Sequence, residues 1–188
     1  EICRSSSLER PVDFDTDGAP FNNVLKSIES NEDMTEWTMH LREGMKWSDG
    51  YPLTTEDVAF TFNDLYMNKE YTSTLPTWLC SGGNASGAPA KLDVVDDYTF
   101  RLIYEEPYYG LPMQLAIKNW VSYYDMINPA HYLKDYHPSY ADADKLQALM
   151  QEKGYDTWTA LFDSYRIVSG EEGHTAAIGY PVLNAWMA

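Results

Sequence analysis

Three carboxylates, those of Asp49, Glu56 and Asp57, lie close together in the sequence, and paired carboxylates can serve as general acid and base in hydrolysis. A general acid needs a raised pKa, which normally comes from burial or from a neighbouring like charge. Glu56 and Asp57, however, follow Thr54 at the expected start of a helix, where the helix dipole and free N–H groups favour ionised carboxylates. Asp49 precedes Gly50 in a sequence typical of a turn. We therefore expect these carboxylates to shape a turn and a capped helix start; a carboxylate-dependent hydrolase fragment is the alternative.

A second acidic motif, DFDTDG, places Asp13, Asp15 and Asp17 in alternation. This order matches the first half of an EF-hand loop, in which alternating carboxylates bind calcium. The match then fails, because Val24 stands where the loop needs its bidentate glutamate. A hydrated turn between two strands explains the same residues, so we expect no metal. A calcium-binding extracellular adhesion module is kept as a further alternative.

The four histidines, His40, His131, His137 and His174, do not form a metal-binding pattern. His131 and His137 are too far apart to share one helix face as an i, i+4 pair would, and His40 lies on an expected strand. The sequence contains no GxSxG, HExxH, Walker-type or GxGxxG element. We therefore expect neither enzymatic activity nor a cofactor.

The charge composition of the chain excludes some classes of binding partner. The 188 residues include 13 basic and 29 acidic side chains, giving a formal net charge of −16. Because the basic residues are scattered, neither nucleic acid nor an anionic membrane surface is an expected partner. No apolar run is long enough to span a membrane, and no secretory leader precedes Glu1, so we expect any such signal to be absent or removed. If the chain is exported, Cys3 and Cys80 could form a disulfide.

Two β-hairpins are the first secondary-structure elements that the sequence predicts. Val24–Glu29 and Trp37–Arg42 partly alternate between apolar and polar residues on either side of a polar connection. Leu92–Val95 and Thr99–Tyr104 flank the acidic turn Asp96–Tyr98 in the same way. Their β-branched and aromatic residues predict a mainly antiparallel sheet.

Helices are expected to flank this sheet. The first helix is expected from Thr54 to about Asn68, with Asp57 completing a capping box at its start. A short helix is expected from Pro129 to Leu133, and a longer one from Ala143 to Lys153, ended by Gly154. One more short helix is expected around Trp158–Phe162.

Two polar, glycine-containing segments, Ser81–Pro89 and Ser169–Gly179, are expected to be surface loops, and the first is not expected to pack against a core. Within the first, Asn84-Ala85-Ser86 fits a glycosylation acceptor, although such triplets are frequent by chance.

Aromatic residues make up 14% of the chain and are dense between Tyr104 and Tyr124. Aromatic rings can stack on sugars and hold peptide side chains, but most of them are expected in the core. Tyr108, Tyr109 and Trp120 are the candidates for exposed, ligand-binding rings.

The stretch EWTMHLREGMKWSDGYPLTTEDVAFTF resembles the signature region of the family 5 extracellular solute-binding proteins, the oligopeptide, dipeptide and nickel-type receptors of ABC importers. In that family a strand ending in Leu-Arg-x-Gly precedes a Trp- or Phe-containing turn, Asp-Gly, Pro, and a helix opening Thr-Ala-x-Asp-Val. The corresponding signature residues here are Leu41, Arg42, Gly44, Trp47, Asp49, Gly50, Pro52, Thr54, Asp57 and Val58. Thr55 replaces the usual alanine. The likeness extends from about Gly18 to Phe162 and includes the hairpin in KLDVVDDYTFRLIYEEPYY.

This resemblance implies an α+β fold, a mainly antiparallel sheet with flanking helices that forms a subdomain of a two-lobed, class II (cluster C) periplasmic-binding-protein-like fold. Residues 1–188 are expected to be one fragment domain of the first lobe. The full-length protein would capture peptides or oligosaccharides outside the cytoplasmic membrane and deliver them to ABC permease subunits. A lipid anchor would hold it at the membrane periphery. In this view the signature residues, Asp49 and Asp57 included, support a scaffold.

Overall fold

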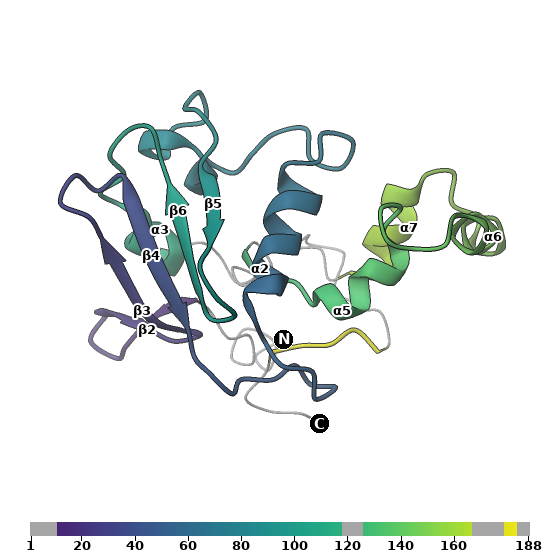
Figure 1. Cartoon of the computed structure of the whole chain (residues 1–188), viewed down its shortest axis with the longest axis horizontal. Helices are drawn as coiled ribbons and strands as arrows, with labels where there is room; N and C mark the ends of the chain where they lie inside the picture. The colour runs from purple at the N-terminus through teal and green to yellow at the C-terminus, as the bar shows by residue number, and fades with distance from the viewer. Residues whose placement is uncertain (1–10, 118–125, 167–178, 184–188) are drawn as a thin grey trace.

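A four-stranded antiparallel sheet forms the centre of the computed structural model, which describes residues 11–117, 126–166 and 179–183 (Figure 1). The strand order is β3-β4-β6-β5. The strands are β3 (Leu25–Ser30), β4 (Glu36–Leu41), β5 (Lys91–Val94) and β6 (Thr99–Ile103). Both predicted hairpins are therefore confirmed, and β4 pairs with β6 to join them into one sheet.

Alternation along the strands divides this sheet into an apolar and a polar face. Met39 and Leu41 of β4 and Phe100 and Leu102 of β6 are almost completely buried. The residues between them point to the other face, where Arg101 forms ion pairs with neighbouring strands. One face of the sheet consequently builds the core, as a period of two residues requires.

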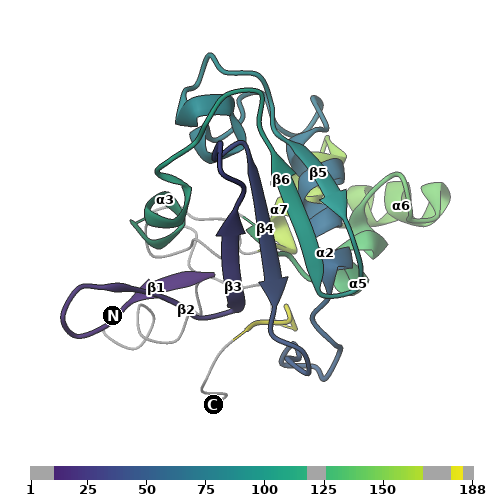
Figure 2. The same ribbon diagram turned by 60° about the vertical axis from the view of Figure 1, so that its left-hand side comes forward.

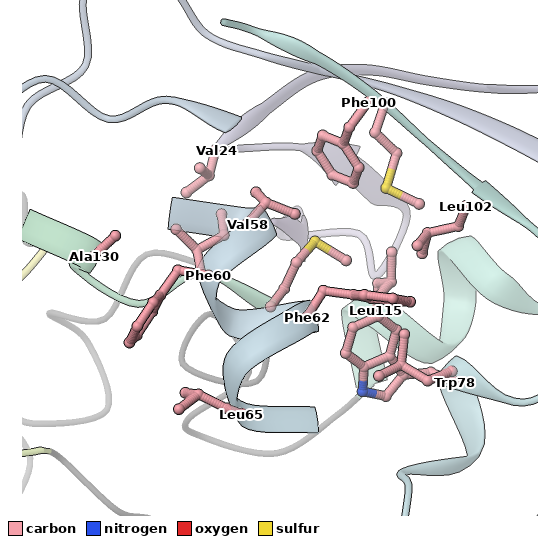
Figure 3. Packing of buried hydrophobic residues seen from close by; sticks show 14 of the residues in the cluster. Val24, Val58, Phe60, Phe62, Leu65, Trp78, Phe100, Leu102, Leu115 and Ala130 are labelled. Carbon is pink, nitrogen blue, oxygen red and sulfur yellow. The ribbon is translucent and has the colours of Figure 1, made fainter. Parts of the chain in front are cut away.

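The segment that covers the apolar face is α2 (Thr55–Phe60), which continues into η1 (Thr61–Tyr66). Figure 3 shows Val58 and Phe62 turned toward Phe100 and Leu102 of the sheet, while Phe60 points toward Ala130 on the opposite side. The sequence predicted one regular helix to about Asn68, but η1 is a π-helix, with the amide of Met67 bonded to the carbonyl of Phe62.

A side chain accounts for the wider turn. The Thr61 hydroxyl donates to the Asp57 carbonyl over 2.7 Å and also accepts the backbone amide of Asn128 over 3.0 Å. A hydroxyl that enters the hydrogen-bond ladder of a helix, together with a partner from outside, is a recognised cause of such irregularities.

Three α-helices lie beyond α2, on the side away from the sheet (Figures 1 and 2). They are α5 (Ala130–Leu133), α6 (Ala143–Lys153) and α7 (Trp158–Ser164). All three follow the sequence prediction, and Gly154 ends α6 in the predicted left-handed conformation with φ +76°. Among the described residues, no helix is long and apolar enough to cross a bilayer.

The sequence prediction gave no bounds for six elements of the described chain. They are β1 (Val12–Phe14), β2 (Pro20–Asn22), α3 (Leu111–Ile117) and the single-turn 3-10 helices η2 (Thr77–Leu79), η3 (Ser81–Gly83) and η4 (Lys134–Tyr136). β1 and β2 pair as a small antiparallel hairpin around the acidic Asp13–Asp17 motif, and α3 packs against both strands. The short strands lack a clear periodicity, and Pro112 masked the helical pattern of α3.

Ser81–Pro89 is a surface loop, as predicted, with Asn84, Ala85 and Ser86 exposed, but its first residues pack closely against neighbouring segments. Ser81 is 1% exposed, and its hydroxyl accepts the Glu105 amide over 2.9 Å. A Cβ atom on Gly83 would lie 2.8 Å from the ring of Tyr108, and one on Gly87 would lie 2.3 Å from the Ser81 carbonyl oxygen. Because glycine has no side chain, these two positions let the loop pack closely against its neighbours. The polar, glycine-containing composition of the loop did not predict this packing. The other predicted loop, Ser169–Gly179, lies outside the described residues except for Gly179.

Candidate functional site

The signature segment forms a tight turn directly after β4. The amide of Trp47 donates to the Tyr51 carbonyl over 2.8 Å, and the amide of Gly50 donates to the Trp47 carbonyl over 2.9 Å. Gly50 has φ +93°, the conformation that favours glycine, as the sequence predicted. Asp49 Oδ1 accepts the Tyr51 amide over 3.2 Å and closes the turn from inside. The Trp47 ring, 2% exposed, anchors the turn in the core.

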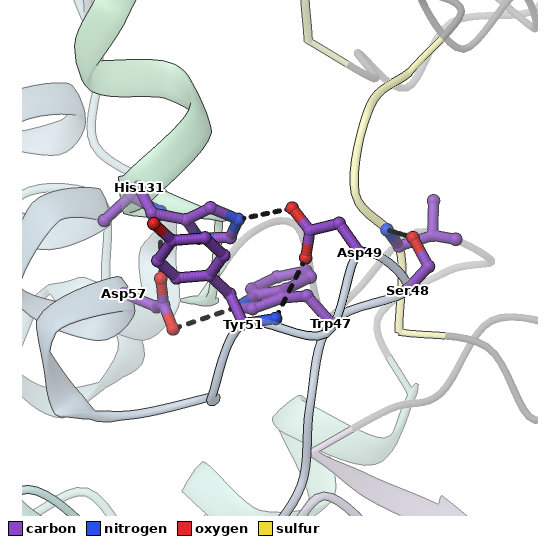
Figure 4. A network of polar contacts seen from close by, with 8 residues as sticks. Trp47, Ser48, Asp49, Tyr51, Asp57 and His131 are labelled. Atoms are coloured by element: carbon purple, nitrogen blue, oxygen red, sulfur yellow. Dashed lines mark hydrogen bonds and ion pairs between the residues drawn. The ribbon is translucent and has the colours of Figure 1, made fainter.

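Asp57 lies at the centre of the polar contacts beneath this turn (Figure 4). Its Oδ2 accepts the Trp47 indole N–H over 3.1 Å and the Thr54 amide over 3.2 Å. Its Oδ1 accepts the Ala130 amide over 2.9 Å, at the start of α5. The predicted capping box between Thr54 and Asp57 is present. One carboxylate thus ties together the turn, the start of α2 and the start of α5.

Burial changes the electrostatics of this carboxylate from what the sequence suggested. Loss of solvent raises the pKa of Asp57 above its ordinary value, whereas the hydrogen bonds from Ala130, Trp47 and Thr54 and the nearby His131 lower it. Burial is the largest of these effects, so the pKa of Asp57 is raised, whereas the sequence predicted a helix start that favours the ionised carboxylate. In all three hydrogen bonds the carboxylate is still the acceptor.

A stacked ring pair covers the outer side of the network. His131 Nε2 lies 2.7 Å from Asp49 Oδ2, and the His131 ring stacks on Tyr51 with centroids 4.1 Å apart and planes 6° apart (Figure 4). Tyr51 is 57% exposed. The contact between His131 and Asp49 and the ring stack attach the turn to α5 from the solvent side, while Asp57 attaches it from the core side.

A second buried polar cluster continues from the first. The Asn128 side chain accepts from the Arg166 guanidinium over 3.0 Å and from the Tyr180 hydroxyl over 3.3 Å, and it donates to Thr61 Oγ1 over 3.2 Å. Arg166 also donates to the Tyr71 hydroxyl over 2.7 Å. Burial is the main cause that raises the pKa of Tyr71 to about 12, so this phenol stays protonated at neutral pH. Segments from four parts of the chain meet here.

The three carboxylates of the opening motif do not converge. Asp57 accepts from the backbone and Trp47, Asp49 contacts His131, and the exposed Glu56 pairs with Lys134 over 2.5 Å. Two hollows in the described part of the chain, one beneath η1 and one beside His40, include none of them. A general acid and base must reach the same substrate atoms, whereas each of these three carboxylates is engaged with a different partner. The geometry fits structural support.

The acidic motif between β1 and β2 does not form an ion cage. Asp15 Oδ1 accepts the amides of Asp17 and Ala19 over 3.0 and 2.8 Å, and the Asp13 carboxylate accepts the Phe14 amide over 2.8 Å. Among the described residues, no group of three acidic, histidine or cysteine side chains is placed to hold a metal. The motif is a turn between strands, which is the simpler of the two interpretations of its sequence.

The aromatic candidates separate in the structure. Tyr109 is 74% exposed, just before α3, and fits the expected exposed ring. Tyr108 is 7% exposed and packs edge-on against Tyr104 with centroids 5.4 Å apart, so its prediction as a surface residue is wrong. Trp120 lies outside the described residues. Residue spacing could not show that Tyr108 is buried and Tyr109 exposed, because Gly83, which lies close to the Tyr108 ring, is distant in sequence.

The disulfide prediction stays untested, because Cys3 lies outside the described residues. Cys80 is buried and, within the described part of the chain, a free thiol whose pKa is raised by loss of solvent.

The other signature residues contact the backbone, lie in the core or form turns. Arg42 donates to the backbone carbonyls of Asn22 and Asn23 over 3.0 and 2.5 Å, Leu41 is buried, and Gly44 has φ +80°. The contacts of Tyr51, Ala130 and His131 with this network were not predicted. No sequence signal could have found them, because α5 lies about 80 residues away along the chain.

The α+β fold of this chain is similar to that of solved periplasmic binding proteins. It superposes on a solved oligopeptide-binding protein OppA with a TM-score of 0.77 and 28% identity, covering 98% of this chain and 26% of that chain. A second structure, the periplasmic binding protein MelB in complex with stachyose from Agrobacterium fabrum C58, shares the fold with a TM-score of 0.62 at 22% identity, covering 96% of this chain and 24% of that one. The class is that of the periplasmic binding proteins.

Residues 19–159 match the family model described as "Bacterial extracellular solute-binding proteins, family 5 Middle", and the chain belongs to this family. The matched range agrees closely with the predicted likeness from Gly18 to Phe162. The resemblance and fold class expected from the sequence are thereby confirmed, and the family is one of substrate-binding proteins.

Two curated relatives illustrate the range of the family. The periplasmic alpha-galactoside-binding protein of Rhizobium meliloti is 32% identical over 126 residues, which is 66% of this chain and 17% of the relative. The periplasmic oligopeptide-binding protein OppA of Salmonella typhimurium is 31% identical over 103 residues, 50% of this chain and 19% of the relative. The chain thus spans about a fifth of the length of these relatives.

Proposed function

We propose that this chain is one structural unit of the substrate-binding component of an ABC importer, which captures peptides or oligosaccharides outside the cytoplasmic membrane. The observation that carries the proposal is the family match over residues 19–159 together with the OppA-like fold. Peptides and oligosaccharides are the two solute classes to test, since relatives named for each are similar to this chain at comparable identity.

The role of this unit within the receptor is to frame one lobe. The network around Asp57 joins three segments through one buried carboxylate, which suits a rigid support for a lobe that closes on ligand about a hinge. The protein performs no covalent chemistry in this proposal, because Asp49, Glu56 and Asp57 are used for internal contacts.

Tyr109 is the residue proposed to border the ligand. Its ring is largely exposed at the start of α3, and the described part of this region also exposes Phe21 on β2 and Met113 on α3. Exposed aromatic and apolar groups near one another on a receptor surface suit both sugar rings and peptide side chains.

Calorimetric titration of the full-length receptor with a panel of oligopeptides and α-galactosides tests the function. Saturable binding of one class at micromolar or lower concentration is expected, and no heat with either class would refute the proposal. The isolated chain should bind neither measurably, because most of the receptor is missing. In the receptor, Tyr109→Ala should weaken binding about tenfold, equivalent to about 1.4 kcal/mol. Val94→Ala, on β5 and also exposed, is the control that should leave affinity unchanged.

The proposal extends to the partners. The full-length receptor is expected to dock on ABC permease subunits and to be held at the membrane by a lipid anchor. Reconstituted transport that depends on added receptor would support docking, and release of the receptor from washed membranes by salt alone would contradict the anchor.

A further inference from the structure

Asn84 begins the only Asn-x-Ser/Thr triplet in this chain. The sequence contains nine asparagines, and the other eight have neither serine nor threonine two residues later. In Asn84-Ala85-Ser86 the middle residue is not proline, which the acceptor pattern for N-linked glycans requires. The family match leaves this triplet without a role.

The triplet is exposed and locally ordered. Asn84 Oδ1 accepts both the backbone amide of Ser86 over 3.1 Å and its hydroxyl over 3.0 Å. These two bonds fix the carbonyl side of the amide group toward Ser86. The amide nitrogen, Nδ2, then faces away and has no hydrogen-bond partner among the described residues. Asn84, Ala85 and Ser86 are all exposed, so a large reagent can approach Nδ2.

The loop that carries the triplet is held closed at its base. The amide of Ser81 donates to the Ala88 carbonyl over 2.8 Å, and the amide of Gly87 donates to the Asn84 carbonyl over 2.8 Å. Cys80 and Pro89 form a β-bridge just beyond. The folded protein therefore presents the triplet at the tip of a narrow loop, and modification does not require unfolding.

The loop also lies far from the signature turn. β5 begins directly after it at Lys91, which pairs with Ile103, and Ile103 pairs with Glu36 at the start of β4. The signature turn instead follows Leu41, at the other end of β4. The two segments accordingly lie at opposite ends of the sheet, as Figures 1 and 2 show. A bulky group on the loop would leave the Asp57 network untouched.

We propose that Asn84 is an acceptor for an N-linked glycan, an inference that rests on the extracytoplasmic location in the proposed function. Nδ2 forms a bond to the anomeric carbon of the first sugar of a lipid-phosphate-linked oligosaccharide. The bond from that carbon to the phosphate oxygen breaks, and the lipid phosphate leaves with the electron pair. The proton lost from Nδ2 passes to a base of the transferase. The product adds a hydrophilic cover to this end of the sheet.

Peptide mass spectrometry on the full-length receptor, purified from the cell that produces it, tests the proposal. Trypsin cleaves after Lys69 and Lys91, and the peptide between them contains Asn84 as its one asparagine. We expect this peptide to carry a sugar mass, and we expect an N-glycan amidase to remove the sugar and leave aspartate at position 84. An unmodified peptide as the sole form would overturn the proposal.

Three variants make the test specific. Asn84→Gln and Ser86→Ala should each abolish the adduct, and Ser86→Thr, which keeps the hydroxyl, should retain it. An adduct that persists in Asn84→Gln would lie on a serine or threonine and would also overturn the proposal. A receptor that binds its solute but carries no sugar contradicts this inference alone. One that carries the sugar but binds neither solute class contradicts the proposed function alone.

Discussion

Replacing Asp57 by asparagine tests whether the signature carboxylate holds structure, because the variant keeps the shape of the side chain but loses its charge and one acceptor atom. The carboxylate accepts three N–H groups, from Ala130 on one oxygen and from Thr54 and Trp47 on the other. The most favourable orientation of the new amide keeps the last two bonds. Its NH2 group then faces the Ala130 amide, which is also a donor, and that amide is stranded.

The expected loss follows from these contacts. A stranded buried donor costs about 1–3 kcal/mol. The two retained hydrogen bonds no longer have a charged acceptor, and a neutral hydrogen bond is roughly half as strong as a charge-assisted one. This weakening adds about 1–2 kcal/mol to the loss of stability. Relief from burying a charge offsets part of the sum, so we expect about 3 kcal/mol. For a chain of this size that corresponds to a fall in melting temperature of about 6–12 °C.

Urea unfolding followed by tryptophan fluorescence measures this difference, and Trp47 itself reports on the network. The matched control is Glu56→Gln, one residue away in the same helical turn. Its carboxylate is 65% exposed and pairs with Lys134, so the loss should stay below about 1 kcal/mol. Equal midpoints for Asp57→Asn and the unmodified chain would refute the scaffold role of this carboxylate. A catalytic activity that disappears in Asp57→Asn without loss of stability would instead support the hydrolase alternative.

Three further predictions concern other parts of the fold. Gly87→Ala should destabilise the chain by about 1–3 kcal/mol, because the new Cβ would lie 2.3 Å from the Ser81 carbonyl oxygen. The control Gly110→Ala, whose nearest contact would be at 3.8 Å, should be nearly neutral in the same urea titration. Burial lowers the pKa of His137, so below about pH 6.5 the unfolded chain takes up a proton that the folded chain resists. Stability should therefore fall between pH 7.5 and 5.5, and His137→Asn should show a flatter dependence; identical slopes would contradict this. Melting temperature should be the same with calcium and with a chelator, and a calcium-dependent rise would revive the metal site between β1 and β2.

Local patterns in the sequence were sufficient to predict most helices and strands, and also the turn and the helix cap of the signature segment. Alternation located both hairpins, and the sequence around Trp47, Gly50 and Thr54 located the turn and the helix cap. These features depend on contacts between residues that are close in the chain, where turn and capping chemistry is specific. The signature resemblance followed from the same residues.

Contacts between distant segments were beyond the reach of the sequence. The ring of Tyr108 lies close to Gly83, and the buried carboxylate of Asp57 accepts the Ala130 amide at the start of α5. Neither partner can be located without the tertiary arrangement. The π-helical end of the long helix has the same origin, since the Thr61 hydroxyl meets Asn128 from another part of the chain.

Two hydrogen bonds between Ser48 and Val182 bear on the order of folding. The amide of Ser48 donates to the Val182 carbonyl over 2.9 Å, and the amide of Val182 donates to Ser48 Oγ over 3.0 Å, across 134 positions of sequence. A ribosome that has just completed the hairpins has not yet synthesised Val182. Such late, long-range closure is slow compared with hairpin formation. The turn that is easiest to recognise in the sequence thus receives these two hydrogen bonds only after nearly all of this chain has been synthesised.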